Sequence, residues 1–299
     1  MSIAAHHPES EQVQVSALPD RRLQVVAACQ ECDFPIMEIT ARKLCECVPF
    51  RALVVLAPDE KCPELRSRLG SNARVIPENE FIPEMRISQL HNLNLQRFPK
   101  GAGWYFQQLL KLQYAFVEPE DDYYLIWDAD TVPLRPMRFF DSAGRMLLTK
   151  ATEFHEPYFD TYRRLLGEEP HREFSLVSQH ILVQKSVARQ MLSRIEQRVE
   201  GEGNWAWKIM RSLPPTGDNL FSEYETYGHY VKNHHSERVA FVNRSWQREF
   251  KPRLRRHIPT RSELELLARD FDYVAFEGLG KSWRRLARSL LAQLPGIGP

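Results

Sequence analysis

The stretch YYLIWDADTVPLRP, residues 123–136, decides the fold predicted for this chain. Aromatic and aliphatic residues run up to Asp128, and Asp130 follows before a turn that is punctuated by prolines. Continuous apolar runs of this length are typical of strands that are buried on both faces of a sheet. We therefore expect a buried strand at 123–128 that ends on two carboxylates.

The elements around this strand alternate in type. We expect strands at 22–29, 51–58, 73–77, 145–150, 238–243 and 272–278. We expect helices at 36–47, 62–69, 83–96, 104–117 and 219–235, and a strand that runs into a helix within 174–196. Apolar strands that alternate with helices are typical of a mostly parallel sheet covered on both faces. The sequence predicts an α/β protein, with a flexible tail at 1–20, a single domain at 21–278 and a helix at 279–299.

Bulk composition narrows the class of protein. The chain has 299 residues, of which 43% are hydrophobic, and its formal net charge is +1. This length suits a sizeable core, and the near-neutral charge argues against a nucleic-acid partner. No apolar run is long enough for a membrane span, and the amino terminus lacks the pattern of a signal peptide. We therefore expect a cytoplasmic protein.

Two local compositional features have ordinary interpretations. All five cysteines fall within the first 62 residues, in C-x2-C and C-x-C spacings that resemble a zinc site only superficially, so we expect reduced thiols. Lys and Arg are concentrated between Arg238 and Arg261. A basic run is most often a solvated face, but it would also suit a phosphate, an acidic glycan or an anionic membrane.

The two aspartates need a positive partner. Carboxylates at the end of a buried strand repel one another and lose hydration, which raises their pKa values and destabilises the fold. A hard divalent cation, Mg2+ or Mn2+, accepts carboxylate and phosphate oxygens together. In the alternative interpretation one aspartate caps the following turn and the other pairs with Arg135 or Arg138.

The helix expected before this strand carries a polar face of unusual composition. Leu109, Leu112 and Phe116 form its apolar stripe. The other side carries the residues that we expect to bind a ligand: Trp104, Gln107, Gln108 and Lys111. Such a face suits an uncharged hydroxylated group beside an anion, although a contact between helices would also explain it.

Four motifs in series carry a resemblance to a known family. They are GWYFQQLLKLQYAF, YYLIWDADTVPLRP, SLVSQHILVQKSVARQML and FSEYETYG. Together they resemble a bacterial family of largely uncharacterised proteins in the nucleotide-diphospho-sugar transferase superfamily, across roughly residues 22–277. Members are glycosyltransferases of the Rossmann-like GT-A fold. The chain is also similar, more distantly, to the glycogenin-like and lipopolysaccharide galactosyltransferases.

The resemblance implies a reaction and its partners. Asp128 and Asp130 would hold Mn2+ or Mg2+ on the diphosphate of a nucleotide-diphosphate sugar, and Lys111 matches a basic residue that reaches the donor. The acceptor would be a glycan or a lipid-linked sugar, as in bacterial surface polysaccharide synthesis. Relatives add a late histidine ligand, for which the candidates here are His229, His234, His235 and His257.

Further site residues follow from the remaining motifs. The resemblance places Gln179 and His180 near the acceptor, although a lone histidine among apolar residues is more often a core residue. On the helix in FSEYETYG, Glu223 and Tyr227 share a face that suits the acceptor, and Glu223 would be the general base of an inverting enzyme. Glu225 is explained by a capping box with Ser222.

Asp33 and the carboxyl-terminal helix each leave two interpretations open. Asp33 follows the first strand, so it would contact the base or ribose of the donor, or else cap the helix that begins near Pro35. Trp283, Leu286 and Leu290 lie on the apolar side of a basic amphipathic helix. This helix would lie on the inner face of an anionic membrane, or pack on its own domain.

Two other classes of protein compete with a transferase. The sequence DADTV also fits the nucleophile motif of haloacid-dehalogenase-type phosphatases, with Asp128 attacking phosphorus. That motif normally follows the first strand of its domain, whereas at least three expected strands precede it here. The other alternative is a non-catalytic sugar-nucleotide-binding protein, against which the two costly aspartates argue.

Overall fold

The computed structural model describes residues 23–91, 93, 101–118, 122–217, 219–248 and 258–277. Its strands are β1 Leu23–Ala28, β2 Phe50–Ala57, β3 Arg74–Pro77, β4 Tyr123–Trp127, β5 Thr131–Pro133, β6 Met146–Thr149, β7 His180–Gln184, β8 Val239–Val242, β9 Trp246–Arg248 and β10 Tyr273–Ala275. Its helices are α1 Phe34–Cys47, α2 Cys62–Leu69, α3 Ile87–His91, α4 Gly101–Gln113, α5 Glu156–Leu166, α6 Lys185–Arg198, α7 Trp205–Ser212, α8 Glu223–His234 and α9 Arg261–Leu267.

The main sheet has five strands in the order β3-β2-β1-β4-β7. The first four are parallel, and β7 runs antiparallel to β4, with Trp127 opposite His180. Strand β4 lies between β1 and β7 and is buried over most of its length, as its continuous apolar sequence predicts. The prediction of a mostly parallel α/β sheet flanked by helices is confirmed.

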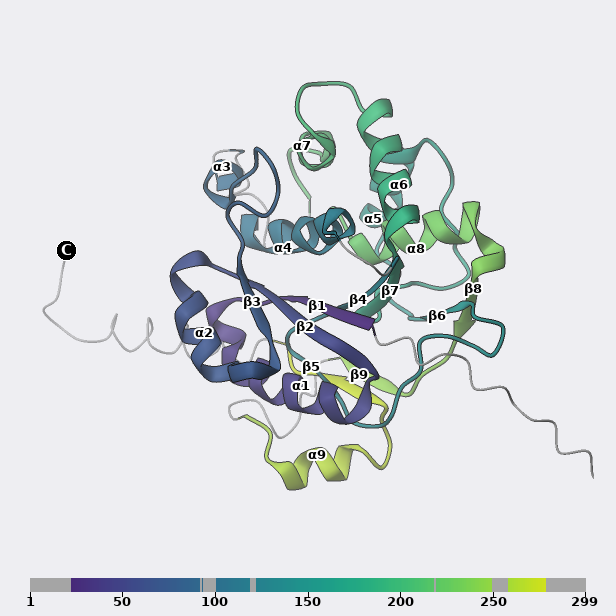
Figure 1. The fold of residues 1–299 in the computed structure, drawn as a ribbon. Coiled ribbons are helices and arrows are strands. Elements are labelled where there is room, and N and C mark those ends of the chain that lie inside the picture. The colour runs from purple at the N-terminus through teal and green to yellow at the C-terminus, as the bar shows by residue number, and fades with distance from the viewer. Residues whose placement is uncertain are drawn as a thin grey trace, which may run out of the picture.

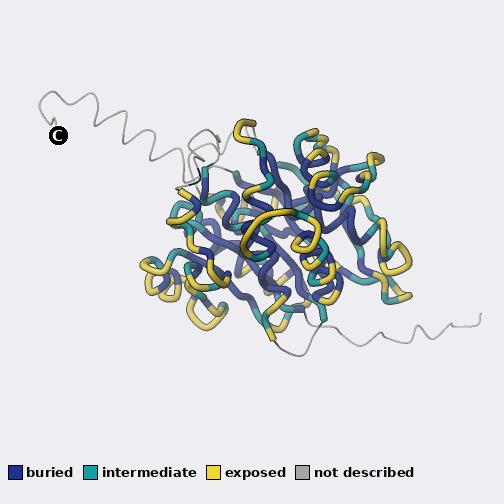
Figure 2. The backbone as a smooth tube through the Cα atoms, turned by 90° about the horizontal axis from the view of Figure 1, so that it is seen from above, coloured by how far each residue is buried: buried dark blue, intermediate teal, exposed yellow. Residues whose placement is uncertain are grey.

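Helices cover both faces of this sheet. Helices α4 to α8 lie on one side, and α1 and α2 lie on the other (Figure 1). Met37 and Leu44 of α1 belong to the main core, whereas Ile36 and Ile39 pack in a smaller core with β5, β10 and α9. Helix α1 is therefore apolar on two sides because it lies between two cores. The buried backbone concentrates in the middle of the molecule in Figure 2.

A small three-stranded sheet brings later segments to the carboxyl end of β4. Strand β5 follows Asp130 and pairs antiparallel with β10, which pairs in parallel with β9. This pairing places Ala275 opposite both Thr131 and Arg248. Strands β6 and β8 form a separate parallel pair. The paired residues of β5 and β10, and those of β6 and β8, are more than 90 residues apart in sequence, so local pattern gives no sign of these two pairings.

Several expected elements differ in the structure. The helix expected at 83–96 is limited to Ile87–His91 among the described residues, because a turn occupies 82–85 and Glu84 has a φ of 63°. Helix α4 starts three residues earlier than expected and ends in a 3-10 turn at Tyr114–Phe116. Helices α5 and α7 were not predicted, and β9 forms within the basic stretch between Arg238 and Arg261.

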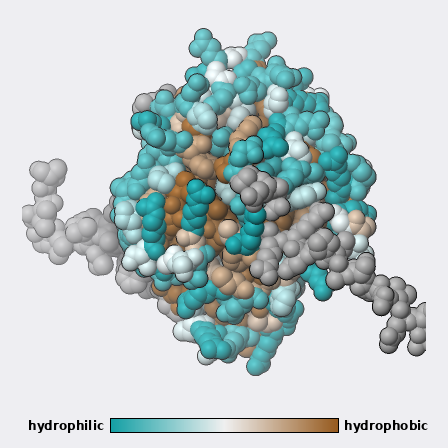
Figure 3. Space-filling view, viewed as in Figure 1, coloured by the Kyte–Doolittle hydropathy of each residue, from teal (hydrophilic) through white to brown (hydrophobic). Residues whose placement is uncertain are grey.

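Some predictions fall outside the described residues. These are the tail at 1–20, the amphipathic helix at 279–299 and residues 249–257 of the basic stretch between Arg238 and Arg261. In the part of the chain that the structure describes, no helix combines the length and apolarity needed to cross a bilayer. On the face seen in Figure 3, hydrophilic side chains cover much of the rim and apolar side chains gather toward the middle.

Candidate functional site

A polar cleft lies at the edge of the main sheet where β1 and β4 end. Ala28 ends β1, Asp128 follows β4, and Gln179 precedes the antiparallel β7, so three neighbouring strands contribute at one edge. Its volume is about 840 Å³, including the part that is open to solvent. We call this the main cleft; it is lined by Ala28, Asp33, Trp104, Gln107, Gln108, Lys111, Asp128, Ala129, Asp130, Tyr158, Val177, Gln179, Ser222, Glu223, Tyr224, Arg248 and Glu277.

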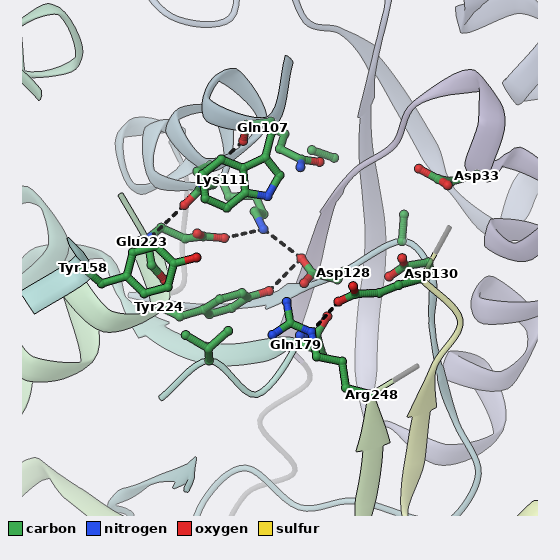
Figure 4. A pocket seen from close by; sticks show the side chains of 17 residues that line it. Asp33, Gln107, Lys111, Asp128, Asp130, Tyr158, Gln179, Glu223, Tyr224 and Arg248 are labelled. Atoms are coloured by element: carbon green, nitrogen blue, oxygen red, sulfur yellow. Dashed lines mark hydrogen bonds and ion pairs between the residues drawn. The ribbon is translucent and has the colours of Figure 1, made fainter. Parts of the chain in front are cut away.

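Lys111 joins two carboxylates from different elements. Its Nζ lies 2.8 Å from Asp128 Oδ1 and forms a second ion pair with Glu223 of α8 (Figure 4). The Lys111 and Glu223 side chains are 4% and 2% exposed. Burial lowers the pKa of Lys111, but the two carboxylates raise it further, so its net pKa lies above the ordinary value. Lys111 therefore remains an ammonium ion.

Asp128 is held by a second donor. The hydroxyl of Tyr224, which is the next residue of α8, donates to Asp128 Oδ1 at 2.8 Å. Burial, followed by the charges of Asp128 and Glu223, raises the pKa of Tyr224 well above its usual range, so the hydroxyl keeps its proton. The main chain of Asp128 is also fixed, because its N–H donates to the Gln179 carbonyl at 3.0 Å.

Asp130 has a different electrostatic environment. Desolvation raises its pKa well above the usual range, and the charges of Asp128, Asp33 and Glu277 raise it further. No cation of the described residues forms an ion pair with its carboxylate. The backbone carbonyl of Asp130 accepts from Phe276 N–H at 2.8 Å, which fixes the residue between β4 and β5. Asp130 is thus a carboxylate in a fixed position whose negative charge is repelled by three other carboxylates.

The alternative partners for the aspartates are not used. Arg135 lies 3.7 Å from Asp272 and donates from Nε to the Ala268 carbonyl at 2.7 Å. The positive partner of Asp128 is Lys111 instead. Among the described residues neither Arg135 nor Arg138 forms an ion pair with Asp128 or Asp130, so the interpretation that paired an aspartate with one of these arginines is wrong.

The polar side of α4 faces the main cleft. Trp104, Gln107, Gln108 and Lys111 all line it. Gln108 also connects two helices, because its Nε2 donates to the Trp104 carbonyl and its Oε1 accepts from Glu223 N–H, both at 3.2 Å. Asp33 precedes α1 and makes no capping hydrogen bond with its side chain, which lines the main cleft.

The predicted acceptor residues divide into two groups. Gln179 and Glu223 line the main cleft, and Gln179 adopts a φ of 67° that non-glycine residues rarely take. His180 and Tyr227 do not line it. His180 Nε2 lies 3.1 Å from Thr149 Oγ1, and the ring stacks on Trp127 in the core. The buried Tyr227 hydroxyl accepts from Gln184 N–H at 2.8 Å. Both are corrected to core residues.

Glu225 has a role that the sequence did not reveal. Ser222 caps α8 as expected, and its Oγ accepts from Glu225 N–H at 3.3 Å. The Glu225 carboxylate, however, accepts from Ser175 Oγ at 2.5 Å and pairs with His229 Nε2 at 2.8 Å. Glu225 therefore fixes the segment that leads to Gln179, in addition to its place beside the helix cap.

The structure also tests the candidate histidine ligands. His229 is buried beside Glu225, His234 pairs with Glu168 at 2.9 Å, and His235 lies 3.0 Å from Gln190. None of these three lines the main cleft, and His257 lies outside the described residues. Within the described ranges, no group of three or more His, Cys, Asp and Glu side chains is arranged to hold a metal ion.

Four lining residues with aromatic or charged side chains were missed by the sequence analysis. Tyr158 comes from α5, Tyr224 from α8, Arg248 from β9 and Glu277 from the residues after β10. Arg248 Nε donates to Glu277 at 2.5 Å, and the guanidinium also pairs with Glu153. Only Tyr224 had an available signal, since it directly follows Glu223 in FSEYETYG.

Comparison with known proteins gives a family for the chain. A family model matches residues 35–253. The chain belongs to this family of unknown function (DUF6492). No curated protein matches the chain.

Several solved structures with some likeness to the chain are glycosyltransferases. Mouse xyloside xylosyltransferase 1 in its apo form has 13% identity and a TM-score of 0.45, over 86% of this chain and 98% of that one. The galactosyltransferase LgtC, solved with donor and acceptor sugar analogs, has 12% identity and a TM-score of 0.42, over 92% and 98%. WbbM, a bifunctional glycosyltransferase, has 10% identity and a TM-score of 0.45, over 86% and 46%. At these values the likeness alone decides neither fold family nor activity.

Proposed function

We propose that this chain is a metal-dependent glycosyltransferase of the GT-A type, which moves a sugar from a nucleotide-diphosphate donor to an acceptor hydroxyl. The observation that carries the proposal is the arrangement of Asp128 and Asp130 at the carboxyl end of β4, beside the buried ammonium of Lys111. Ligands of open α/β sheets bind at this edge of the sheet. A diphosphate is a ligand for which both a metal and an ammonium are suited.

The residues present fit a divalent cation. Asp128 and Asp130 offer hard oxygen ligands, and the raised pKa of Asp130 is the property expected of a carboxylate that needs a further positive charge. Mn2+ or Mg2+ would be held by these two side chains, with the donor diphosphate among its other ligands. When bound, the cation stabilises the negative charge that develops on the leaving diphosphate.

The donor would lie between α4 and the end of β1. Lys111 is placed to offset charge on the departing diphosphate, because its ammonium already lies beside Asp128. Trp104, Gln107 and Gln108 supply an aromatic surface and amide groups for a sugar or nucleoside. Asp33, on the opposite wall in Figure 4, is proposed to contact the ribose or base.

The acceptor would enter on the side of Gln179, Tyr158 and Tyr224. Glu223 belongs to this wall, but its carboxylate is engaged by Lys111. We therefore propose that Glu223 first positions Lys111, and that it accepts the acceptor proton only in an inverting reaction during which this ion pair opens. A glycan or lipid-linked sugar remains the proposed acceptor class.

Neither rival function is favoured by a specific observation. Phosphatases of the haloacid-dehalogenase type place their nucleophilic aspartate after the first strand, whereas Asp128 follows β4. A non-catalytic binding protein would keep Asp130 in an unfavourable electrostatic environment without benefit. Release of nucleoside diphosphate from a nucleotide sugar distinguishes the proposed function from both alternatives.

Release of nucleoside diphosphate tests the proposed function. The protein is incubated with a panel of nucleotide sugars, with Mn2+ or with EDTA, and the released nucleoside diphosphate is measured. We expect release of nucleoside diphosphate from at least one donor with Mn2+. The rate of release should fall by about 100-fold or more in Asp130→Asn, since the metal acts on the leaving group. Asp160→Asn, at a solvent-exposed aspartate of α5, is the control that retains activity. Release that is unaffected by EDTA and by Asp130→Asn would contradict the proposal.

A further inference from the structure

A second groove lies where the strands of the β6–β8 pair end. Thr149 and Val242 are opposite one another at the carboxyl ends, and Lys150 N–H donates to the Val242 carbonyl at 2.9 Å. Beyond this bond the segments 150–153 and 243–248 form the walls of a groove. We call it the β6–β8 groove; it is lined by Lys150, Ala151, Thr152, Glu153, Asn243, Arg244, Trp246, Gln247 and Arg248.

Two cations in the β6–β8 groove have no carboxylate partner among the described residues. Arg244 Nε donates to Thr149 Oγ1 at 3.2 Å, and its guanidinium lies 5.6 Å from the Phe139 ring centroid. Lys150 Nζ lies 5.0 Å from the Phe174 ring centroid. Among the described residues, neither cation has a carboxylate within ion-pair distance. Burial lowers the pKa of Arg244, which indicates a guanidinium that would gain from an anion.

The acid in the β6–β8 groove does not neutralise these cations. Glu153 is engaged by Arg248, whose Nε also donates to Glu277 at 2.5 Å. The Arg248 guanidinium therefore has two carboxylates, whereas Arg244 and Lys150 have none among the described residues. The remaining charge of the groove is positive, and an anion would stabilise it.

Aromatic and amide groups accompany this charge. Trp246 stacks on Tyr273, with ring centroids 5.4 Å apart and 14° between the planes, so its orientation is fixed. Asn243 and Gln247 lie beside it in the lining. A rigid aromatic side chain, amides and unpaired cations together suit a hydroxylated ligand that carries an anionic group.

The β6–β8 groove is joined to the main cleft by one residue. Arg248 lines both, and its side chain in Figure 4 lies below Asp130, at the rim of the main cleft. A ligand in the β6–β8 groove would therefore extend toward the place where sugar transfer is proposed. No residue assigned to donor binding lies in this groove.

We propose that the β6–β8 groove binds an anionic sugar unit of the acceptor glycan, with Arg244 and Lys150 on its carboxylate or phosphate and Trp246 against its ring. This assignment rests on the proposed function, because it extends the acceptor side of the same site. It names the acceptor class as an acidic or phosphorylated glycan.

Ligand-observed NMR titration of the full chain tests this proposal, without donor or metal. The probes are glucuronic acid, glucose 6-phosphate and glucose. We expect at least one anionic sugar to bind about tenfold more tightly than glucose, since a charge-assisted hydrogen bond supplies a difference of this size. Binding of glucuronic acid alone identifies a carboxylate as the ligand group, and binding of glucose 6-phosphate alone identifies a phosphate.

Variants locate the binding and keep the proposal falsifiable. Lys150→Gln and Arg244→Gln should each weaken binding of the anionic sugar by about tenfold. Lys43→Gln on α1 should leave this affinity unchanged. Because Arg244 also donates a hydrogen bond to Thr149, circular dichroism checks that Arg244→Gln remains folded. If that variant unfolds, Lys150→Gln alone tests the proposal. Equal affinity for glucose, or unchanged affinity in Lys150→Gln, would overturn the proposal. Failure of the proposed function would appear separately, as absent turnover of nucleotide sugars.

Discussion

Asp128 and Asp130 differ in charge environment although a single residue separates them. Asp128 receives both the Lys111 ammonium and the Tyr224 hydroxyl at Oδ1. Asp130 faces Asp128, Asp33 and Glu277, which all raise its pKa. The charge of Asp128 is therefore compensated by Lys111, whereas Asp130 has no positive partner among the described residues. This asymmetry is the residue-scale basis for the proposed metal.

Replacing Lys111 by Met should destabilise the fold strongly. The change leaves Glu223 buried without its positive partner, and breaking a buried ion pair costs about 3–5 kcal/mol. Urea denaturation of Lys111→Met measures the loss of unfolding free energy. The double variant Lys111→Met with Glu223→Gln removes the buried charge and should recover much of that loss. Additive losses in the double variant would show that the two residues do not act as a pair.

Asp130→Asn should stabilise the metal-free protein at neutral pH. A carboxyl group whose pKa is raised in the folded state costs stability at pH values above its unfolded pKa, because the unfolded chain ionises more readily. Removing this charge should raise the unfolding free energy by about 1–3 kcal/mol in EDTA at pH 7. The difference should shrink as the pH falls toward about 4, the unfolded pKa of aspartate. Chemical denaturation across pH measures this, and an Asn variant that is less stable at pH 7 would contradict it.

At the scale of elements, neighbouring residues of α8 line the main cleft and hold the segment before β7. Glu223 and Tyr224 reach the main cleft, while Glu225 turns to the segment before β7. There its carboxylate accepts from Ser175 Oγ and from Leu176 N–H, the latter at 3.2 Å. This contact fixes the segment that leads to Gln179, which lines the main cleft with a left-handed backbone.

Glu225→Ala should cost more stability than loss of the helix cap beside it. The change leaves Ser175 Oγ and Leu176 N–H buried without their acceptor, which should cost about 2–4 kcal/mol. Ser222→Ala removes a single capping bond and should cost about 1 kcal/mol. Thermal and urea unfolding of both variants measure the difference. Equal losses would mean that Glu225 acts only through the cap of α8.

At the scale of the whole molecule, the main cleft combines residues that local sequence patterns predict with residues that only the long-range pairing of strands brings there. The apolar run of β4 and the polar face of α4 are local patterns, so Asp128, Asp130 and Lys111 could be predicted. Arg248 and Glu277 arrive through the pairing of β5, β10 and β9, which no local pattern encodes. His180 and Tyr227 have the chemistry of site residues, but packing places them in the core.

Isothermal titration of nucleoside diphosphates into the protein with Mn2+ tests the central claim most directly. The account predicts that at least one nucleoside diphosphate binds with Mn2+, that EDTA abolishes the binding, and that Asp130→Asn weakens it by about tenfold or more, since the metal loses a ligand. Asp160→Asn should bind as the wild type does. Metal-independent binding that survives Asp130→Asn would contradict the claim that Asp128 and Asp130 hold a metal on the donor diphosphate.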